Sequence, residues 1–215
     1  MKRVNLSITV ALFATLFFTS CEPKEPKGNE TITPAKIGVK INGVVWAPYN
    51  VDAFGTFAAK PESTGMFYQW NRPTAWAATG SVTGWDNSPI TGTTWAKAND
   101  PSPKGWRVPT KEELESLVYS PDKVTSEFTT VNNIFGRRFT DKATGNSIFL
   151  PAAGARTSDG SLHREREFAC YWSSTDHADV GCAYALLMDV TVQNFYFIDY
   201  QYYNCGLSVR SVAAE

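Results

Sequence analysis

The sequence predicts an α+β fold in which an antiparallel, loop-rich sheet carries one or two short helices. Short apolar alternations bounded by turn residues dominate the last third of the chain, a pattern typical of antiparallel strands. One stretch has a clear helical pattern with a cap. Seven tryptophans and 13% aromatic residues in a chain of 215 indicate a single domain with a core of large rings.

The domain is expected to begin with a hairpin. Ile37, Val39 and Ile41 alternate with small or polar residues, which predicts a strand with one buried face. The dipeptide Asn42-Gly43 favours a two-residue turn, so residues 44–46 would form the second strand.

Long loops are expected over residues 51–100. This stretch has little periodicity and is rich in Gly, Pro, Ser and Thr. We expect buried rings to hold the loops in place, and the candidates are Trp70, Trp76, Trp85 and Trp95.

The clearest helix signal starts at Thr110. Thr110 and Glu113 have the spacing of a capping box, in which each side chain bonds to the other residue's backbone N–H. The helix should end near Tyr119, and its buried face would carry Leu114, Leu117 and Val118.

The rest of the chain is expected to be mainly strands. A short second helical turn is predicted near residues 131–135, before Gly136. A turn is predicted at 144–146. The expected strands are 137–140, 147–150, 171–174, 183–190, 193–199 and 207–212.

The start of the chain predicts export. Lys2 and Arg3 precede an apolar run over residues 8–18, and small residues lead into Cys21. The apolar run is shorter than the about 20 residues of a membrane-spanning helix. We expect residues 1–20 to be a lipoprotein signal peptide and Cys21 to carry lipid, with ordinary secretion as the alternative.

The expected product is a lipoprotein of the outer membrane, displayed at the cell surface on a tether. Residues 21–36 are rich in Pro, Lys, Glu and Thr, which favours a flexible tether, and residues 37–215 form the domain. Loss of residues 1–20 changes the formal charge from −1 to −3. No basic stripe is available for a phosphate backbone, so nucleic acid is not an expected partner.

Five ordered motifs resemble the FISUMP family, the Fibrobacter succinogenes major paralogous domain. They span roughly residues 37–213 and are Phe67–Trp70, Gly105–Leu114, Phe149–Gly154, Tyr171–Ser174 and Ser208–Arg210. The second motif is also similar to one in formylglycine-generating proteins. The resemblance implies a C-type-lectin-like fold with its first and last strands side by side. It also implies surface lipoproteins of Bacteroidota-like bacteria with adhesin-like roles.

Structural roles are expected for the motif residues. Trp106 would fill the core beneath the helix, and Pro109 would direct the chain into it. The planar guanidinium groups of Arg107 and Arg210 suit fixed hydrogen bonds to carbonyls or a carboxylate. Trp172, in the fourth motif, belongs to the same structural set.

The cysteines leave two alternatives open. The family resemblance implies that a disulfide is lost here, since the family often has cysteine where this chain has Ser102 and Ser211. We read these two as a polar pair that replaces the bridge. Besides Cys21 there are Cys170, Cys182 and Cys205; a bridge between Cys182 and Cys205 is one possibility, and three free thiols are the other.

Catalysis is not expected, and neither is a cofactor or a metal. Asp176, His177 and Asp179 could offer metal ligands, but a solvated turn explains them more simply. Cys205 has no close partner of the kind that formylglycine-generating enzymes use. Glu113 serves the helix cap, and its neighbouring glutamates point to solvent in an ordinary helix.

A binding role fits the end of the sequence better. Tyrosines combine apolar area with a polar tip, which suits recognition surfaces, although strand packing is the competing explanation. We therefore expect a non-catalytic adhesion or carbohydrate-binding module for glycan or another envelope or host component. A structural or assembly subunit of a surface complex is the alternative. The candidate ligand-binding residues are Tyr196, Asp199, Tyr200, Tyr202, Tyr203 and Asn204.

Overall fold

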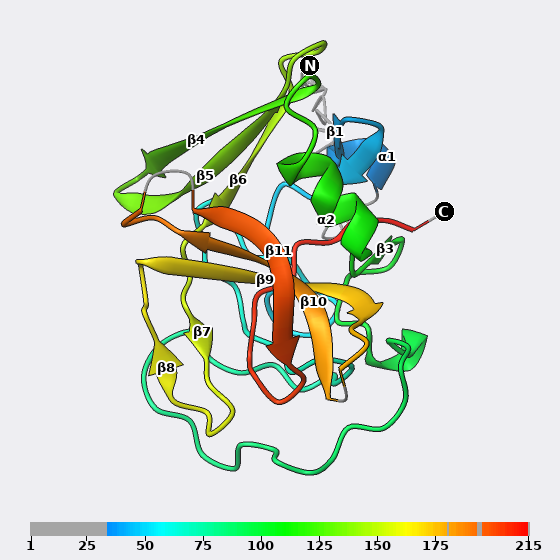
Figure 1. Ribbon diagram of the computed structural model, residues 1–215, viewed down its shortest axis with the longest axis vertical. Coiled ribbons are helices and arrows are strands. Elements are labelled where there is room, and N and C mark those ends of the chain that lie inside the picture. Colours follow the sequence, from blue (N-terminus) through cyan, green and yellow to red (C-terminus); the bar gives the residue numbers. More distant parts are fainter. Residues whose placement is uncertain (1–33, 180, 193–194, 215) are drawn as a thin grey trace, which may run out of the picture. The chain divides into compact units, whose positions relative to one another are not determined.

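Antiparallel pairing joins the strands of the computed structural model, which describes residues 34–179, 181–192 and 195–214 (Figure 1). These residues belong to one compact unit, Thr31–Glu215. Most of the regular structure is antiparallel β-sheet, and the longest helix among the described residues, α2 (Lys111–Val118), has eight residues. The described part is therefore richer in sheet than the predicted α+β class suggests. The predicted signal peptide and Cys21 lie outside the described residues.

The first sheet brings both ends of the domain together. After the one-turn helix α1 (Pro34–Ile37), which includes the last residues of the predicted tether, the predicted hairpin is present. Asn42 and Gly43 have φ values of 46° and 88°, the left-handed turn that this dipeptide favours. The sheet has the order β1-β2-β12-β3, with bounds Val39–Ile41, Val44–Trp46, Val212–Ala213 and Trp106–Arg107.

The central sheet separates two hydrophobic clusters. Its order is β11 (Tyr196–Tyr202), β10 (Cys182–Asp189) and β9 (Phe168–Asp176). Successive side chains of a strand point to opposite faces. The first face of the sheet carries Trp172, Ala185 and Leu187, which pack with Trp70 and Trp95 of the loops. The second face carries Tyr171, Leu186, Met188 and Ile198, which belong to the cluster that includes Leu114 and Leu117 of α2.

A second three-stranded sheet replaces the helical turn predicted near residues 131–135. β4 (Val124–Val131) and β5 (Ile134–Asp141) form a hairpin, and β6 (Ser147–Pro151) pairs with β5. The prediction was wrong because Asn132 and Asn133, with φ values of 48° and 63°, make a tight hairpin turn. Asparagine tolerates this left-handed conformation better than most residues.

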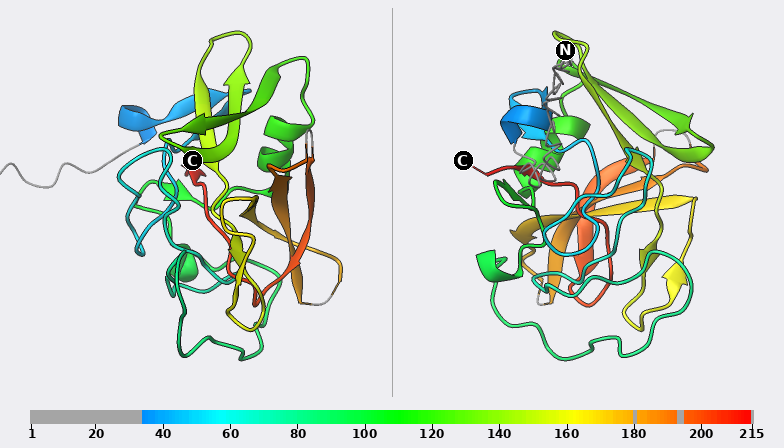
Figure 2. Two further views of the ribbon diagram at one scale, coloured as in Figure 1. Left: turned by 90° about the vertical axis from the view of Figure 1, so that its left-hand side faces the viewer. Right: turned by 180° about the vertical axis from the view of Figure 1, so that it is seen from behind.

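The loop region 51–100 is confirmed as largely irregular. It holds isolated bridges and the short 3₁₀ helix η1 (Lys97–Asn99). Trp70 and Trp95 are buried, and Trp70 Nε1 donates to Ser173 O of β9 at 3.0 Å. In the left view of Figure 2, the cyan part of this region lies on the opposite side from β10 and β11.

Several further predictions changed at the level of single strands. The two-stranded sheet of β7 (Ala155–Arg156) and β8 (Leu162–His163) was not predicted. The strand expected at 207–212 reduces to β12, because the preceding residues make isolated bridges such as Tyr171↔Ser208. The residues before β12 therefore pair with several different segments and do not form a continuous ladder with one strand.

Arg210 fixes the junction of three segments from within the core. It is fully buried, and its guanidinium donates to Asn50 Oδ1, Ala47 O and Phe149 O at 2.8–3.2 Å. Burial lowers the pKa of Arg210 to about 10, so the group remains charged at neutral pH. The structural role predicted for Arg210 is confirmed.

The two serines form the predicted polar pair. Ser211 Oγ donates to Ser102 Oγ at 2.8 Å, across 109 residues of chain. A hydrogen bond therefore joins the end of the domain to the segment that leads into α2.

No disulfide joins the three cysteines of the described residues. Cys170, Cys182 and Cys205 are all buried, so the bridge considered between Cys182 and Cys205 is absent from this structure. Burial raises the pKa of each thiol, that of Cys205 to about 11. The thiolate that disulfide chemistry requires is accordingly disfavoured.

A candidate ligand-binding surface

The tyrosines of the last strand divide into buried and exposed members. Tyr203, which follows β11, is only 7% exposed; it stacks on Trp70 with ring centroids 4.4 Å apart and its hydroxyl donates to Asp176. Burial raises the pKa of Tyr203 above its usual value. Tyr196 is half-buried, with the guanidinium carbon of Arg137 lying 3.4 Å from its ring centroid. Tyr203 is a packing residue and Tyr196 is partly covered by Arg137, so strand packing, the alternative to a ligand-binding role, describes their surroundings.

Asp199 protects the edge of the sheet. β11 is an edge strand, and unpaired backbone groups on such a strand attract further strands. Asp199 Oδ1 accepts from the backbone N–H of Tyr200 at 2.9 Å, and the hydroxyl of Tyr119 accepts from that of Ile198 at 3.0 Å. Asp199 is exposed, and one of its carboxylate oxygens is occupied by this hydrogen bond. Asn204 is half-buried and accepts from Gln69 Nε2 through its backbone carbonyl at 3.1 Å.

Tyr200 and Tyr202 are the two tyrosines of the predicted set whose rings stay exposed. Their exposed fractions are 40% and 59%. Because they are two residues apart in β11, they project from the same face of the sheet, beyond the part that cluster residues such as Ile198 occupy. These two tyrosines thus remain available to a ligand.

Three more side chains complete this surface. Tyr184 lies opposite Tyr200 in the β10–β11 register, and the ring of His177 lies 4.8 Å from both rings. Lys111 Nζ lies 4.3 Å from the ring centroid of Tyr184, in cation–π geometry. We call the group Lys111, His177, Tyr184, Tyr200 and Tyr202 the aromatic surface.

The capping motif places Lys111 on the aromatic surface. Thr110 and Glu113 form the predicted capping box, and Arg107 binds both carboxylate oxygens of Glu113 at 2.7 Å. The backbone N–H of Lys111 donates to Thr175 Oγ1 of β9 at 3.0 Å. These bonds attach the first turn of α2 to the central sheet. The predicted structural roles of Arg107, Thr110 and Glu113 are confirmed.

The other motif residues are also structural, with one change of position. Trp106 is buried, but it does not lie beneath the helix as predicted; its ring meets that of Phe57 edge to face at 5.4 Å. The tryptophan that packs with the leucines of α2 is Trp46. Pro109 O accepts from Ser174 N at 2.7 Å. Trp172 is fully buried and donates to Tyr68 O at 2.7 Å.

Sequence reasoning missed Lys111 and Tyr184 and assigned His177 to a solvated turn. The turn is present, and His177 Nδ1 accepts from Asp179 N at 3.1 Å. The missing signal was hairpin register, because an antiparallel pairing of β10 with β11 places Tyr184 beside Tyr200. Lys111 could be found only from the way α2 packs on the sheet.

The aromatic surface combines apolar and polar groups. Its side chains supply ring faces, hydroxyl groups, an imidazole and one ammonium group. Among residues 34–179, 181–192 and 195–214, no three His, Cys, Asp or Glu side chains gather as a metal site. Within the same ranges no helix is long and apolar enough to cross a bilayer.

Comparison with protein-family models, curated proteins and solved structures finds no match for this chain. The resemblance to the FISUMP family therefore stays a prediction from its motifs.

Proposed function

We propose that this protein is a non-catalytic, lipid-anchored binding module that recognises glycan through its aromatic surface. The observation that carries the proposal is the pair Tyr200 and Tyr202, exposed side by side on one face of an edge strand. Tyrosine presents apolar area with a polar tip at low entropic cost, and sugars offer both C–H faces and hydroxyl groups.

The fixed geometry of the surface supports recognition of a defined ligand. The ring of His177 lies against that of Tyr200 with an angle of 30° between the ring planes, and Lys111 lies over Tyr184. Side chains that are already ordered lose less entropy on binding. The Lys111 ammonium also lies 3.5 Å from Glu115, so its charge is partly balanced. Because the charge of Lys111 is partly balanced by Glu115, we expect a ligand without strong negative charge.

The proposal also includes a C-type-lectin-like fold and a location at the outer membrane. The pairing of β2 with β12, which joins the two ends of the domain, supports a C-type-lectin-like variant. The resemblance to the FISUMP family and the leader sequence support display at the outer membrane. Lipidation of Cys21 would be seen as the mass of attached acyl chains, and its loss in Cys21→Ser would release the protein from the membrane.

Glycan-array binding tests the proposal directly. We expect saturable binding by the purified protein and at least a tenfold loss in Tyr200→Ala and Tyr202→Ala, because exposed aromatic residues dominate binding energies. Phe54→Ala is the matched control, since Phe54 is 47% exposed in the loop region. An unchanged array signal in both tyrosine variants would overturn the assignment of the site.

A structural or assembly role is the second candidate. Phe135, Val192 and Phe195 are apolar side chains that are each at least 41% exposed. Exposed apolar residues favour contacts with other proteins where they form a contiguous patch. Stable co-purification with envelope proteins that is lost in Phe195→Ser, together with no glycan signal, would support this role in place of the first.

A further inference from the structure

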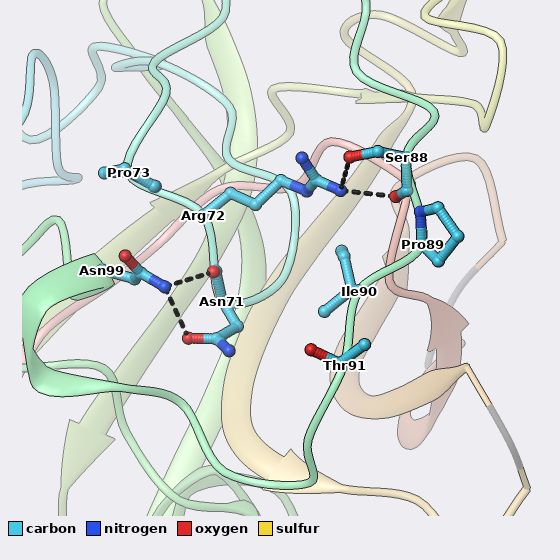
Figure 3. A pocket seen from close by; sticks show the side chains of 8 residues that line it. All are labelled: Asn71, Arg72, Pro73, Ser88, Pro89, Ile90, Thr91 and Asn99. Atoms are coloured by element: carbon cyan, nitrogen blue, oxygen red, sulfur yellow. Dashed lines mark hydrogen bonds between the residues drawn. The ribbon is translucent and has the colours of Figure 1, made fainter.

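A pocket of about 270 Å³ lies between two segments of the long loop region (Figure 3). One wall is residues 71–73 and the other is residues 88–91, and Asn99 closes the end beside Asn71. None of these residues belongs to the aromatic surface. The pocket is therefore a separate candidate site.

Arg72 crosslinks the two walls. Its Nη2 donates to the backbone carbonyl and the hydroxyl of Ser88 at 2.5 and 2.9 Å, and its Nη1 pairs with Asp86. Asp86 Oδ1 in turn accepts from the backbone N–H and hydroxyl of Ser88. The arginine charge is thus balanced, and the relative position of the walls is set without a ligand.

Asn71 and Asn99 fix the closed end. Asn71 has a φ of 55°, and its Oδ1 accepts from Ala96 N at 2.8 Å and from Asn99 Nδ2 at 3.2 Å. Asn99 Nδ2 also donates to Asn71 O at 2.8 Å. Asparagine tolerates this left-handed conformation, and these hydrogen bonds hold Asn71 in place beside Asn99.

Three hydrogen-bonding groups remain without a protein partner. Among the described residues, no hydrogen bond is made by Asn71 Nδ2, Asn99 Oδ1 or Thr91 Oγ1. Figure 3 shows the Thr91 hydroxyl directed toward the side-chain amide of Asn71. The set comprises one donor, one acceptor and one hydroxyl that can act as either.

The remaining lining is neutral and partly apolar. Pro73, Pro89 and Ile90 contribute C–H surface, and Ile90 is half-buried against the first core cluster. A ligand that complements this lining presents C–H faces and hydroxyl groups, carries no net charge and is small, since the pocket volume is about 270 Å³.

We propose that this pocket binds one neutral pyranose unit. The proposal rests on the proposed glycan-binding function and adds to it a second subsite and a ligand class. The amide groups of Asn71 and Asn99 and the Thr91 hydroxyl bind sugar hydroxyl groups, while Ile90 and the two prolines contact the ring.

The test is an NMR titration of the purified protein with methyl β-D-glucopyranoside and methyl α-D-mannopyranoside. We expect saturable shifts of the side-chain amide signals of Asn71 and Asn99, with a dissociation constant of about 1 mM for at least one probe. Glucuronate, the charged probe, should bind more weakly. A stronger response to glucuronate would overturn the assignment of a neutral ligand.

Two variants change single polar groups of the pocket. Asn71→Asp keeps the acceptor for Ala96 N and Asn99 Nδ2 but replaces the Nδ2 donor with a charged carboxylate oxygen, and Thr91→Val replaces the hydroxyl with a methyl group. Each should weaken the affinity about fivefold, as expected for one hydrogen bond. Thr93→Val, an exposed position in the same loop that does not line the pocket, should bind as the parent does.

The outcomes separate this proposal from the aromatic surface. If Tyr200→Ala abolishes binding on the array but leaves the monosaccharide shifts at Asn71 and Asn99, both sites stand. If no probe shifts these amides while the array signal persists, the pocket proposal fails and the aromatic surface stands. If Thr93→Val weakens binding as much as Thr91→Val, the effect is not specific and the pocket proposal also fails.

Discussion

The second face of the central sheet contains two regions that both have a tyrosine at their centre. One tyrosine, Tyr171, is buried, and the other, Tyr200, is exposed. Around Tyr171 the polar groups are enclosed and paired: its hydroxyl donates to Pro151 O at 2.8 Å and accepts from Asn50, which also holds Arg210. Around Tyr200 the rings are ordered by each other, yet the side chain is 40% exposed.

The difference shows that burial decides whether a tyrosine contributes to stability or is accessible to a ligand. A tyrosine whose hydroxyl has protein partners contributes to stability, and burial raises the pKa of Tyr171 to about 12. A tyrosine that keeps an exposed ring and hydroxyl retains the capacity to bind a ligand. Mutations in the two regions should therefore separate stability from binding.

The largest expected effect is in the enclosed region. Arg210→Met should lower the free energy of unfolding by about 4 kcal/mol, because three buried acceptors lose their donor. Urea unfolding measures this loss. Arg138→Met is the control, since its ion pair with Glu127 is exposed, and a change within about 0.5 kcal/mol is expected there. Equal losses in the two variants would break the comparison.

The enclosed framework should also accept a crosslink that leaves the open region unchanged. The pair Ser102→Cys and Ser211→Cys closes a loop of about 110 residues, and the disulfide should raise the stability by about 3 kcal/mol under oxidising conditions. Unfolding with and without a reductant gives the difference. Glycan binding should not change; a loss of binding would mean that the framework and the surface are coupled.

A smaller effect distinguishes the tyrosines directly. Tyr171→Phe removes one buried hydroxyl, which takes one of two donors from the Pro151 carbonyl and the acceptor from Asn50 Nδ2, and should cost about 1.5 kcal/mol. Tyr184→Phe, on the same face but half-buried at the aromatic surface, should cost less than about 0.5 kcal/mol. Thermal unfolding of the two variants side by side would show the order, and the reverse order would contradict it.

The smallest effect is expected at Tyr202. Tyr202→Ala should change the free energy of unfolding by less than about 0.5 kcal/mol, because the side chain is 59% exposed. The same variant should lose binding on the glycan array. A large loss of stability would instead assign Tyr202 to packing, like Tyr203.

Local signals in the sequence were enough for several elements. The Asn42-Gly43 hairpin and the capping box of Thr110 and Glu113 are confirmed, because each depends on neighbours within a few residues. The helical turn predicted at 131–135 was wrong, although the signal was also local: two successive asparagines form a hairpin turn.

The candidate site was predicted only in part. Tyr200 and Tyr202 were named, but Tyr196 and Tyr203 were placed with them, and alternation within one strand cannot tell which end of a face is covered. Trp70, which stacks on Tyr203, lies more than 130 residues earlier in the chain. Such long-range contacts leave no periodic signal.

The sequence by itself determined the first hairpin, the capped helix and the run of tyrosines near the last strand, since the first two follow from turn chemistry and apolar spacing. Tertiary structure alone decided which tyrosines stay open. The packing of α2 and the loop region covers one set of rings and leaves Tyr184, Tyr200 and Tyr202 beside His177 and Lys111. The physical reason is that burial depends on segments distant in sequence, whereas propensity depends on neighbours.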